Sequence, residues 1–227
     1  MTEYARIIEE GRYFEAVSFS AEDLGRAALY AENSQRDAFE AKFADYGEYL
    51  DSLEMVAEIA PFKPVYLERI AQLTNKTNQF NLTTRRYTLA EMEQRANDPN
   101  CIALYGKLKD RFGDYGLISV VLGHRTGDAL EIDLWLMSCR VLKRGMEAAM
   151  LDTLVEAAQS RRITELRGTY LPTAKNAMVA EFYPSLGFQR EAEPSKELPE
   201  GATRWSLDLR GYSKQNRHIQ RMEFSHV

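Results

Sequence analysis

The sequence predicts a mixed α/β or α+β fold in which helices cover a central sheet. Residues 101–108, 116–122 and 130–137 are three strand-like runs, short and mostly apolar. Residues 146–158 repeat apolar side chains at helical spacing, and another strand-like run follows at 163–170. Because helices are interleaved with runs of strands, we expect one mixed sheet that packs against helices.

Local signals give the order of the elements. Pro61 ends the first strand, since proline cannot donate to a sheet ladder, and the polar run 75–84 favours caps and turns. The methionines of the 146–158 stripe are expected to be core residues. The other expected elements are one long or two broken helices at 21–50, a strand at 53–59, helices at 65–74 and 89–96, a hairpin turn at 124–127, a helix at 174–186 and a strand at 202–209.

Composition divides the chain into three parts. Residues 1–50 are expected to form a helical extension, or the tail of a preceding domain, because they lack apolar surface for a core of their own. Residues 53–209 carry the predicted sheet and form the main domain. Residues 210–227 are polar with scattered apolar side chains, and this C-terminal tail is expected to be either disordered or folded back.

Charge and composition exclude several classes of function. A net charge of −5 over 227 residues argues against a nucleic-acid partner. No apolar run approaches the roughly 18 residues of a membrane span and no leader is seen, so we expect a soluble cytoplasmic protein without a membrane partner. With 2 cysteines, 3 histidines and no Cys-x-x-Cys pattern, neither a disulfide framework nor a metal site is expected.

The segment 133–145 carries the strongest chemical signal. An alternating strand runs into Cys139, then into the basic pair Lys143 and Arg144, and then into Gly145, which is expected to open the next helix. A thiol beside a helix N-terminus is favoured as thiolate by unpaired N–H groups, which suits acyl-thioester chemistry. The basic pair and the glycine are candidates for binding a phosphate-bearing cofactor. The alternative is that Cys139 is an ordinary buried apolar side chain.

The predicted hairpin also assigns neighbours to Cys139. With the turn centred near residues 126 and 127, Cys139 lies opposite Asp114 or Tyr115. Asp114 is therefore the expected catalytic partner that orients or deprotonates thiols. His124 falls about nine residues further along the hairpin, roughly 30 Å away, and is not expected to act as the base.

A second informative run, at 176–188, resembles the acyl-CoA-binding end of the GNAT acetyltransferase superfamily. The shared pattern consists of Asn176, Ala180, Phe182, Tyr183, Gly187 and Phe188. The resemblance implies a GNAT-like fold with a mixed central sheet. It also implies catalytic roles for Asn176 and Tyr183, with the tyrosine protonating the departing pantetheine thiolate. The alternative is a helix-capping asparagine and a core tyrosine.

The phosphate loop departs from the GNAT pattern. The Gln/Arg-x-x-Gly-x-Gly/Ala pattern of that superfamily falls on Leu142, Gly145 and Glu147, so only the middle glycine matches. A carboxylate at residue 147 is expected to repel the diphosphate of CoA. The phosphopantetheine arm of a carrier protein has a single phosphate, so this loop would have to bind less negative charge. It is therefore the expected cofactor, with CoA as the alternative.

Four further segments resemble the C-terminal part of the FkbH-like proteins of polyketide assembly lines. They are residues 75–87, 110–116, 135–142 and 172–178. The resemblance implies a GNAT-like domain that works with a haloacid-dehalogenase-type phosphatase domain. It also implies that a glyceryl group from 1,3-bisphosphoglycerate is loaded on an acyl carrier protein through a cysteine thioester. The chain contains no Asp-x-Asp pair, so phosphatase activity is not expected from it.

The resulting hypothesis is an acyltransferase in which Cys139 attacks the donor and the carrier thiol then attacks the thioester. The residues expected to bind the glyceryl substrate or its phosphate are Asn78, Asn81, Thr83 and Arg85. Two rivals remain open. One is an ordinary GNAT N-acyltransferase that uses acetyl-CoA and an amine, and the other is a non-catalytic module that docks a carrier protein.

Overall fold

The computed structural model describes residues 34–36, 38–192 and 198–222. The chain divides into two compact units, Met1–Ala44 and Asp45–Val227, and the second unit contains the sheet. Residues 21–33 and 37 of the helical region expected at 21–50 lie outside the described residues. The described part of that region contains helical residues at 34–36 and 38–40, followed by α3 at Tyr46–Ser52.

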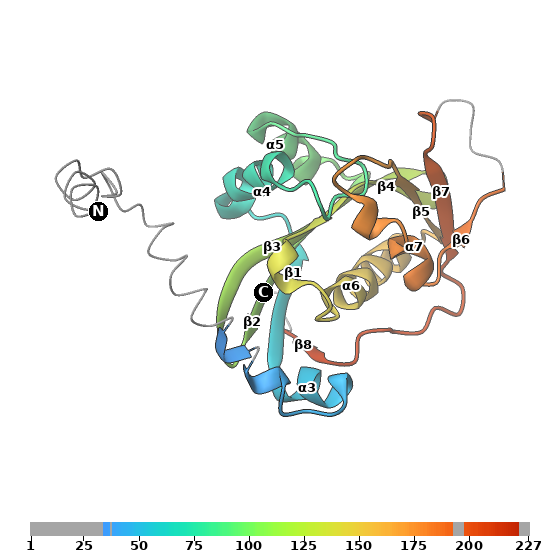
Figure 1. The fold of residues 1–227 in the computed structure, drawn as a ribbon. Helices are drawn as coiled ribbons and strands as arrows, with labels where there is room; N and C mark the ends of the chain where they lie inside the picture. Colours follow the sequence, from blue (N-terminus) through green and yellow to red (C-terminus); the bar gives the residue numbers. More distant parts are fainter. Residues whose placement is uncertain (1–33, 37, 193–197, 223–227) are drawn as a thin grey trace, which may run out of the picture. The chain divides into compact units, whose positions relative to one another are not determined.

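The described strands form one sheet in the order β6-β7-β5-β4-β3-β2-β1-β8 (Figure 1). Strands β1 to β4 are antiparallel neighbours, whereas β4 pairs with β5 and β1 pairs with β8 in parallel. The strands are β1 (Met55–Pro61), β2 (Cys101–Asp110), β3 (Gly113–Thr126), β4 (Ala129–Met137), β5 (Glu165–Tyr170), β6 (Gln189–Arg190), β7 (Thr203–Asp208) and β8 (Ile219–Arg221). The predicted mixed sheet is confirmed, and part of the tail folds back as β8.

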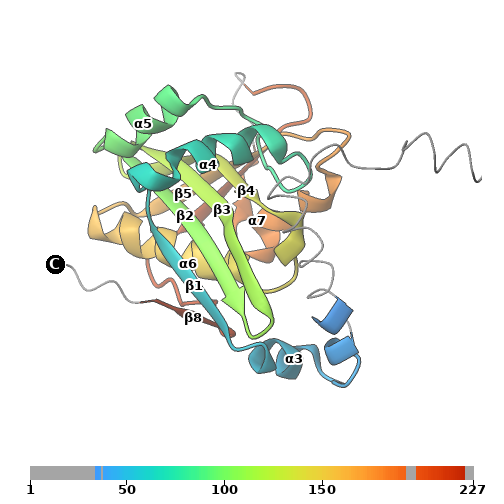
Figure 2. The same ribbon diagram turned by 90° about the vertical axis from the view of Figure 1, so that its left-hand side faces the viewer.

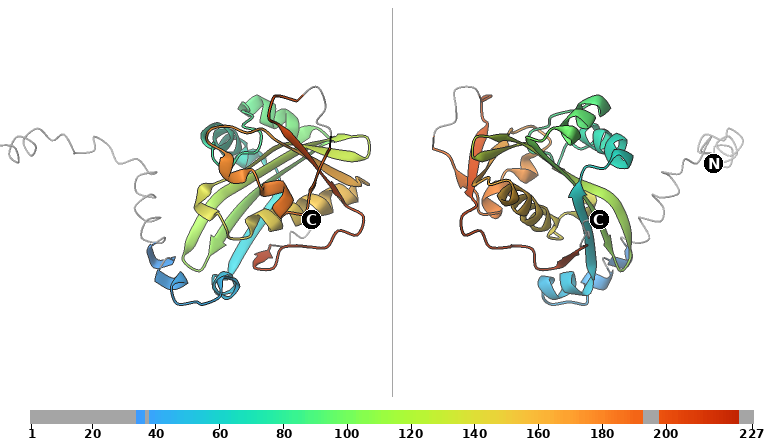
Figure 3. Two further views of the ribbon diagram at one scale, coloured as in Figure 1. Left: turned by 45° about the vertical axis from the view of Figure 1, so that its right-hand side comes forward. Right: turned by 180° about the vertical axis from the view of Figure 1, so that it is seen from behind.

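Helices cover both faces of this sheet. Figure 2 shows α4 and α5 crossing one face, and Figure 3 shows α6 on the other. The helices are α4 (Pro64–Lys76), α5 (Leu89–Asn97), α6 (Met146–Ser160) and α7 (Phe182–Ser185), with short 3-10 helices at Cys139–Val141 and Ala177–Val179. Helix α5 begins at a capping box, in which Thr88 and Glu91 satisfy each other's backbone N–H groups. Among the described residues, no helix is long and apolar enough to cross a membrane.

The single helix expected at 174–186 is wrong. The structure has a 3-10 turn at Ala177–Val179 and a separate short helix, α7, that begins at Phe182. Pro184 explains the break, because a proline ring inside a continuous helix would collide with the carbonyl of Ala180 and remove a backbone donor. In α7 the proline sits in the first turn, where its missing N–H is tolerated.

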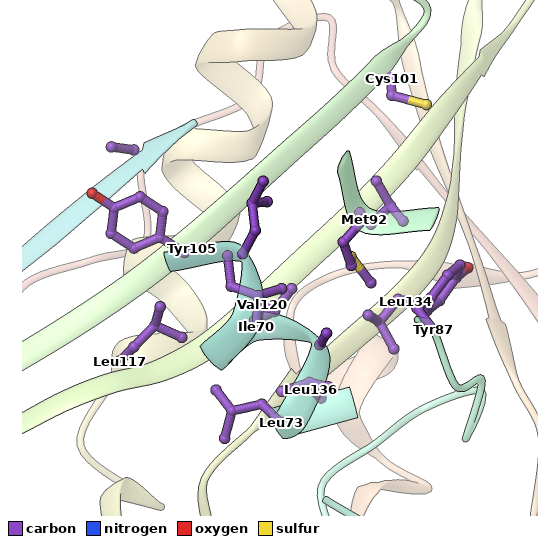
Figure 4. Packing of buried hydrophobic residues seen from close by; sticks show 14 residues of the cluster. Ile70, Leu73, Tyr87, Met92, Cys101, Tyr105, Leu117, Val120, Leu134 and Leu136 are labelled. Carbon is purple, nitrogen blue, oxygen red and sulfur yellow. The ribbon is translucent and has the colours of Figure 1, made fainter. Parts of the chain in front are cut away.

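The core lies on both faces of the sheet. On the first face, Figure 4 shows Ile70 and Leu73 of α4 against Val120 and Leu136 of the strands. On the other face, Met146 and Met150 of α6 are fully buried, and both methionines lie against Gly106 of β2. The methionine stripe is therefore core, as the sequence predicted.

The hairpin between β3 and β4 has a different register from the predicted one. The strands continue to the pair Thr126↔Ala129, so the turn is centred on residues 127 and 128, one residue later than expected. A bulge then shifts the register between Leu122 and Gly123, with Asp133 as the extra residue on β4. As a result, Ser119 faces Met137, and the amide of Ser138 donates to the Ile118 carbonyl (2.7 Å). The predicted pairing of Cys139 with Asp114 is wrong.

We predict that Gly168→Ala lowers the free energy of unfolding by about 1–3 kcal/mol, because an added methyl overpacks a closed contact. A Cβ at this position in β5 would lie 2.2 Å from Cζ of Tyr183, whose ring is buried. The matched control is Gly106→Ala, whose Cβ would come too close only to the flexible ends of Met146 and Met150 and would make an ordinary contact with Ser119. Urea denaturation of both variants checks this, and an equal loss of stability in the two would contradict it.

Candidate functional site

Cys139 lies where β4 ends. It is the first residue of the short 3-10 helix, and its side chain is exposed. The neighbouring Ser138 hydroxyl accepts from the backbone N–H of Arg140 (3.4 Å), which fixes the turn. Helix α6 begins only at Met146, with Gly145 as its N-cap. The glycine therefore opens the helix as predicted, but Cys139 is not in the first turn of α6.

A cleft of about 660 Å³ opens beside Cys139, between α4, the loop that follows it and the end of β4. Among the described residues that line this cleft, none is acidic. Its lining consists of Arg69, Leu73, Lys76, Thr77, Asn78, Gln79, Phe80, Met137, Ser138, Cys139, Ala174 and Lys175. An exposed thiol thus stands in a cleft with three basic side chains, in a chain whose net charge is −5.

The second cysteine, Cys101, is in a different environment. It is buried at the start of β2 and donates to the Asp98 carboxylate (3.5 Å). Burial raises the pKa of the Cys101 thiol, and Asp98 adds to this rise while Arg95 opposes it. The two thiols are therefore clearly distinguished by their access to solvent.

Asp114 does not accompany Cys139. It pairs with Lys109 in the β2–β3 hairpin, and its carboxylate accepts from the Gly116 amide (2.7 Å). It lines a separate hollow of about 200 Å³ together with Glu58 and Lys107. The predicted role of Asp114 as a partner of the thiol is therefore corrected, because it depended on the wrong hairpin register.

Of the four residues expected to bind substrate, one lines the Cys139 cleft and the other three do not. Asn78 lines the Cys139 cleft, where its side-chain oxygen accepts from Arg86. Asn81 is fully buried, and its side chain is used inside its own loop, to the Thr77 carbonyl (3.2 Å) and the Thr84 amide (2.9 Å). The other two are engaged by one residue of β4, since Thr83 donates to the Asp133 carbonyl (2.8 Å) and Arg85 to its carboxylate (2.7 Å).

The residues Phe80–Thr83, here called the bridging segment, fill an opening in the sheet. Strands β4 and β5 pair only from Ala129↔Glu165 to Ile132↔Gly168, and β4 then continues to Met137 without β5 as its neighbour. The bridging segment takes that place and forms an antiparallel bridge between Asn81 and Leu136. All four of its residues are buried.

Asn176 holds the bridging segment rather than lining the cleft. It is fully buried, and its amide donates to the carbonyls of Asn81 and Leu171 (2.9 Å each). Its side-chain oxygen accepts from the Thr173 amide (2.7 Å). The catalytic role expected for Asn176 is thus replaced by a positioning role, because both ends of its side chain are occupied by the protein's own backbone.

Tyr183 is likewise a core residue in this structure. Only 1% of it is exposed, and its hydroxyl lies against Gly168. Burial raises the pKa of Tyr183 far above its ordinary value, and the Thr169 backbone offsets this only in part. The hydroxyl does not line the cleft of Cys139, so the structure has a core tyrosine where a proton donor beside the thiol was expected.

The residues expected to bind a cofactor do not form a diphosphate site for CoA. Gly145 has a positive φ of 79°, and Lys143 is exposed, but the Arg144 guanidinium donates to the Asp110 carboxylate (2.9 Å). Glu147 lies in the first turn of α6, and burial raises its pKa. Because Arg144 is bound to Asp110 and residue 147 carries a large side chain where the GNAT pattern has glycine or alanine, the loop does not match that pattern for binding the two phosphates of CoA. Among the described residues, no cluster of three or more His, Cys, Asp or Glu side chains could hold a metal.

Sequence reasoning missed the basic side chains of the cleft. Arg69 and Lys76 are seven positions apart on α4, two helical turns, which places them on one face. Lys175 immediately precedes Asn176 in one of the segments that carried the family resemblance. The helical spacing was a usable signal, but nothing in the sequence indicated which face of α4 turns toward Cys139.

We predict that iodoacetamide alkylates Cys139 at least about tenfold faster than Cys101, because an exposed thiol reacts more readily than a buried one with a raised pKa. Peptide mass spectrometry of the native chain after short labelling gives the two rates. Unfolding in urea is the control and should bring the rates together. Comparable rates in the native chain would contradict the difference in burial.

Solved structures similar to this one are GNAT acetyltransferases. The ribosomal-protein-S18-alanine N-acetyltransferase from Escherichia coli matches with a TM-score of 0.50 and 14% identity, covering 76% of this chain and 99% of that one. The GNAT domain of S. lividans PAT gives 0.51 and 18%, with 67% and 90% covered. A spermidine N-acetyltransferase SpeG chimera from Vibrio cholerae and hSSAT gives 0.52 and 12%, with 68% and 96% covered.

No family model and no curated protein sequence matches this chain. At the identities of the similar structures, the likeness establishes the fold alone. The order of the strands, the separation of β4 from β5 and these matches together lead to one conclusion, which the sequence had predicted: the chain has the GNAT acetyltransferase fold.

Proposed function

We propose that this chain is an acyltransferase that carries an acyl group on Cys139 and passes it to the phosphopantetheine thiol of an acyl carrier protein. Following the FkbH-like resemblance, the acyl group is a glyceryl group derived from 1,3-bisphosphoglycerate. A haloacid-dehalogenase-type phosphatase domain is the proposed partner that processes the phosphorylated donor, because this chain lacks the Asp-x-Asp pair for that step.

The observation that carries the proposal is the exposed thiol of Cys139 in an acid-free basic cleft. A thiol must be accessible to form a thioester, and a cleft of about 660 Å³ has room for a small acyl group and the end of a pantetheine arm. Arg69, Lys76 and Lys175 supply positive charge for a phosphate. The amides of Asn78 and Gln79 supply hydrogen bonds for glyceryl hydroxyl groups.

The chemistry follows from two attacks on one carbonyl carbon. The Cys139 thiolate attacks the acyl phosphate, a C–S bond forms, and the C–O bond breaks as phosphate leaves with the electron pair, which gives a 3-phosphoglyceryl thioester. In the phosphatase domain, water then displaces the 3-phosphate at phosphorus, so that a second inorganic phosphate is released and the glyceryl thioester remains. The pantetheine thiolate then attacks the thioester, a new C–S bond forms, and the Cys139 sulfur leaves as thiolate. The two thiol protons are released to solvent or to the departing phosphate. No oxidant or reductant is needed.

The rival N-acyltransferase reading takes its support from the fold, since two of the similar structures are N-acetyltransferases by name. Two observations count against it: the opening between β4 and β5 is filled, and the loop at 142–147 departs from the phosphate-binding pattern of the GNAT superfamily. The non-catalytic docking module leaves the exposed Cys139 without a role. We therefore favour the thioester relay.

We predict that Cys139→Ala abolishes the added glyceryl mass on this chain. The protein is incubated with the phosphatase domain and 1,3-bisphosphoglycerate, and intact-mass spectrometry detects the adduct. Loading of carrier protein should fall at least about 100-fold, because without the Cys139 nucleophile the acyl-enzyme thioester cannot form.

Two controls match this variant. Cys101→Ala removes the buried thiol and should keep the adduct, and Tyr183→Phe should keep the loading rate within about twofold, since its hydroxyl is buried. A Cys139→Ala protein that loads carrier at the native rate would overturn the relay.

We predict that Lys175→Glu slows carrier loading by about tenfold, because it places a carboxylate in the cleft that is proposed to receive a phosphate. The control is Lys109→Glu, which changes the net charge equally at an exposed position of β2 outside the cleft lining. Initial rates at increasing carrier concentration show whether KM carries the effect. Equal effects of the two variants would contradict a local role of Lys175.

A further inference from the structure

We propose that the bridging segment, Phe80–Thr83, is a specificity element that excludes CoA thioesters from the opening between β4 and β5. Pantetheine-bearing substrates then reach Cys139 through the basic cleft beside α4. The exclusion of CoA stands on the geometry alone, whereas the route to Cys139 rests on the proposed function.

The opening has the dimensions and polarity of a strand position. Two parallel strands that part after four pairs leave a gap of about 9–10 Å, two strand spacings, edged by unpaired N–H and C=O groups. An extended arm with amide groups, such as pantetheine, is a chemical match for such a gap, because it can add to the sheet as a strand does. Whatever fills the gap must satisfy these backbone groups.

The bridging segment already satisfies both edges. The Leu82 amide donates to the Trp135 carbonyl of β4 (3.1 Å), and the Leu82 carbonyl accepts from the Leu171 amide directly after β5 (2.8 Å). The Phe80 carbonyl accepts from the Met137 amide (3.0 Å). A pantetheine arm in this place would have to break all three bonds.

Side chains clamp the segment at both ends. Asn176 donates to the Asn81 carbonyl, and Thr83 donates to the carbonyl of Asp133, which the β-bulge leaves free of β3. Leu82 is fully buried, and Phe80 packs edge-on against Phe182 with ring centroids 5.3 Å apart. Withdrawal of the segment would expose these apolar side chains, so the segment is a fixed part of the sheet rather than a lid.

The same stretch of chain connects the filled opening to the cleft. Thr77, Asn78 and Gln79 line the cleft of Cys139, and Phe80 belongs both to the cleft lining and to the bridging segment. The segment therefore closes the opening within the sheet while it holds one wall of the cleft. The loop at 142–147 does not line this cleft, so a substrate arm with a single phosphate, rather than the diphosphate of CoA, is the class proposed to enter it.

The test combines binding and hydrogen exchange on the full chain. Isothermal titration with acetyl-CoA should give no saturable heat up to about 1 mM. In the same protein, the amides of Leu82, Met137 and Leu171 should exchange at least about 100-fold more slowly than unprotected amides. Acetyl-CoA at about 1 mM, the highest concentration of the titration, should leave their exchange rates unchanged.

The clamp is tested with Asn176→Ala, which should speed exchange at Leu82 and Leu171 by at least about tenfold. The matched control is Asn97→Ala, because the exposed Asn97 amide bonds only to Glu93 within α5 among the bonds described. If Asn176→Ala does not fold, Thr83→Val removes the bond to Asp133 at nearly constant volume and should speed exchange at Leu82.

Saturable binding of acetyl-CoA to the native chain, or fast exchange at Leu82 in the native chain, would overturn the proposal. Neither readout involves the Cys139 thiol, so Cys139→Ala should behave as the native chain in both. If the thioester relay fails, the exclusion of CoA by the bridging segment can still be tested in this way. Binding of CoA would refute that exclusion but would not decide whether Cys139 is acylated.

Discussion

The backbone of Leu82 is hydrogen-bonded to β4 on one side and to the residue after β5 on the other, and the rest of the site depends on this double contact. It joins two strands that otherwise part, and it fixes the direction in which the chain leaves α4. Because Thr77–Phe80 are held in this way, they face the end of β4 and form a cleft with Cys139. This local pairing thus closes the opening between β4 and β5 and, at the same time, shapes the open cleft beside Cys139.

The bulge at Asp133 is the second element of this arrangement. An extra residue in β4 shifts the hairpin register and leaves one carbonyl free of β3, and that carbonyl is the one that Thr83 uses. The same residue's carboxylate meets Arg85 and His124 (2.7 and 2.8 Å). Bulges of this kind redirect side chains, and here the irregularity in the sheet provides the attachment point for an inserted segment.

Most of the secondary structure could be predicted, because β2, β3 and β4 contain short, mostly apolar runs and α6 has clear helical spacing. The site could be predicted only in part. The place of Cys139 at a strand end follows from its local sequence, but its exposure does not, since a buried thiol was the alternative. Asp114 was misplaced because the position of a bulge and the centre of a two-residue turn are not fixed by the sequence pattern. Asn176 and Tyr183 were recognised by motif, but a motif does not distinguish a side chain that binds ligand from one that binds its own backbone.

Strand β8 has a consequence at the opposite end of the sheet. It lies along β1, where the Met222 amide donates to the Ala57 carbonyl and Arg221 forms an ion pair with Glu156 of α6 (2.7 Å). An uncovered β1 would present a row of unsatisfied peptide groups, the kind of border through which sheets of separate molecules join. The few residues of β8 therefore cover the edge of the sheet and disfavour self-association. A protein shortened before Ile219 would expose the edge of β1 to pairing with another molecule, although its cleft would be unchanged.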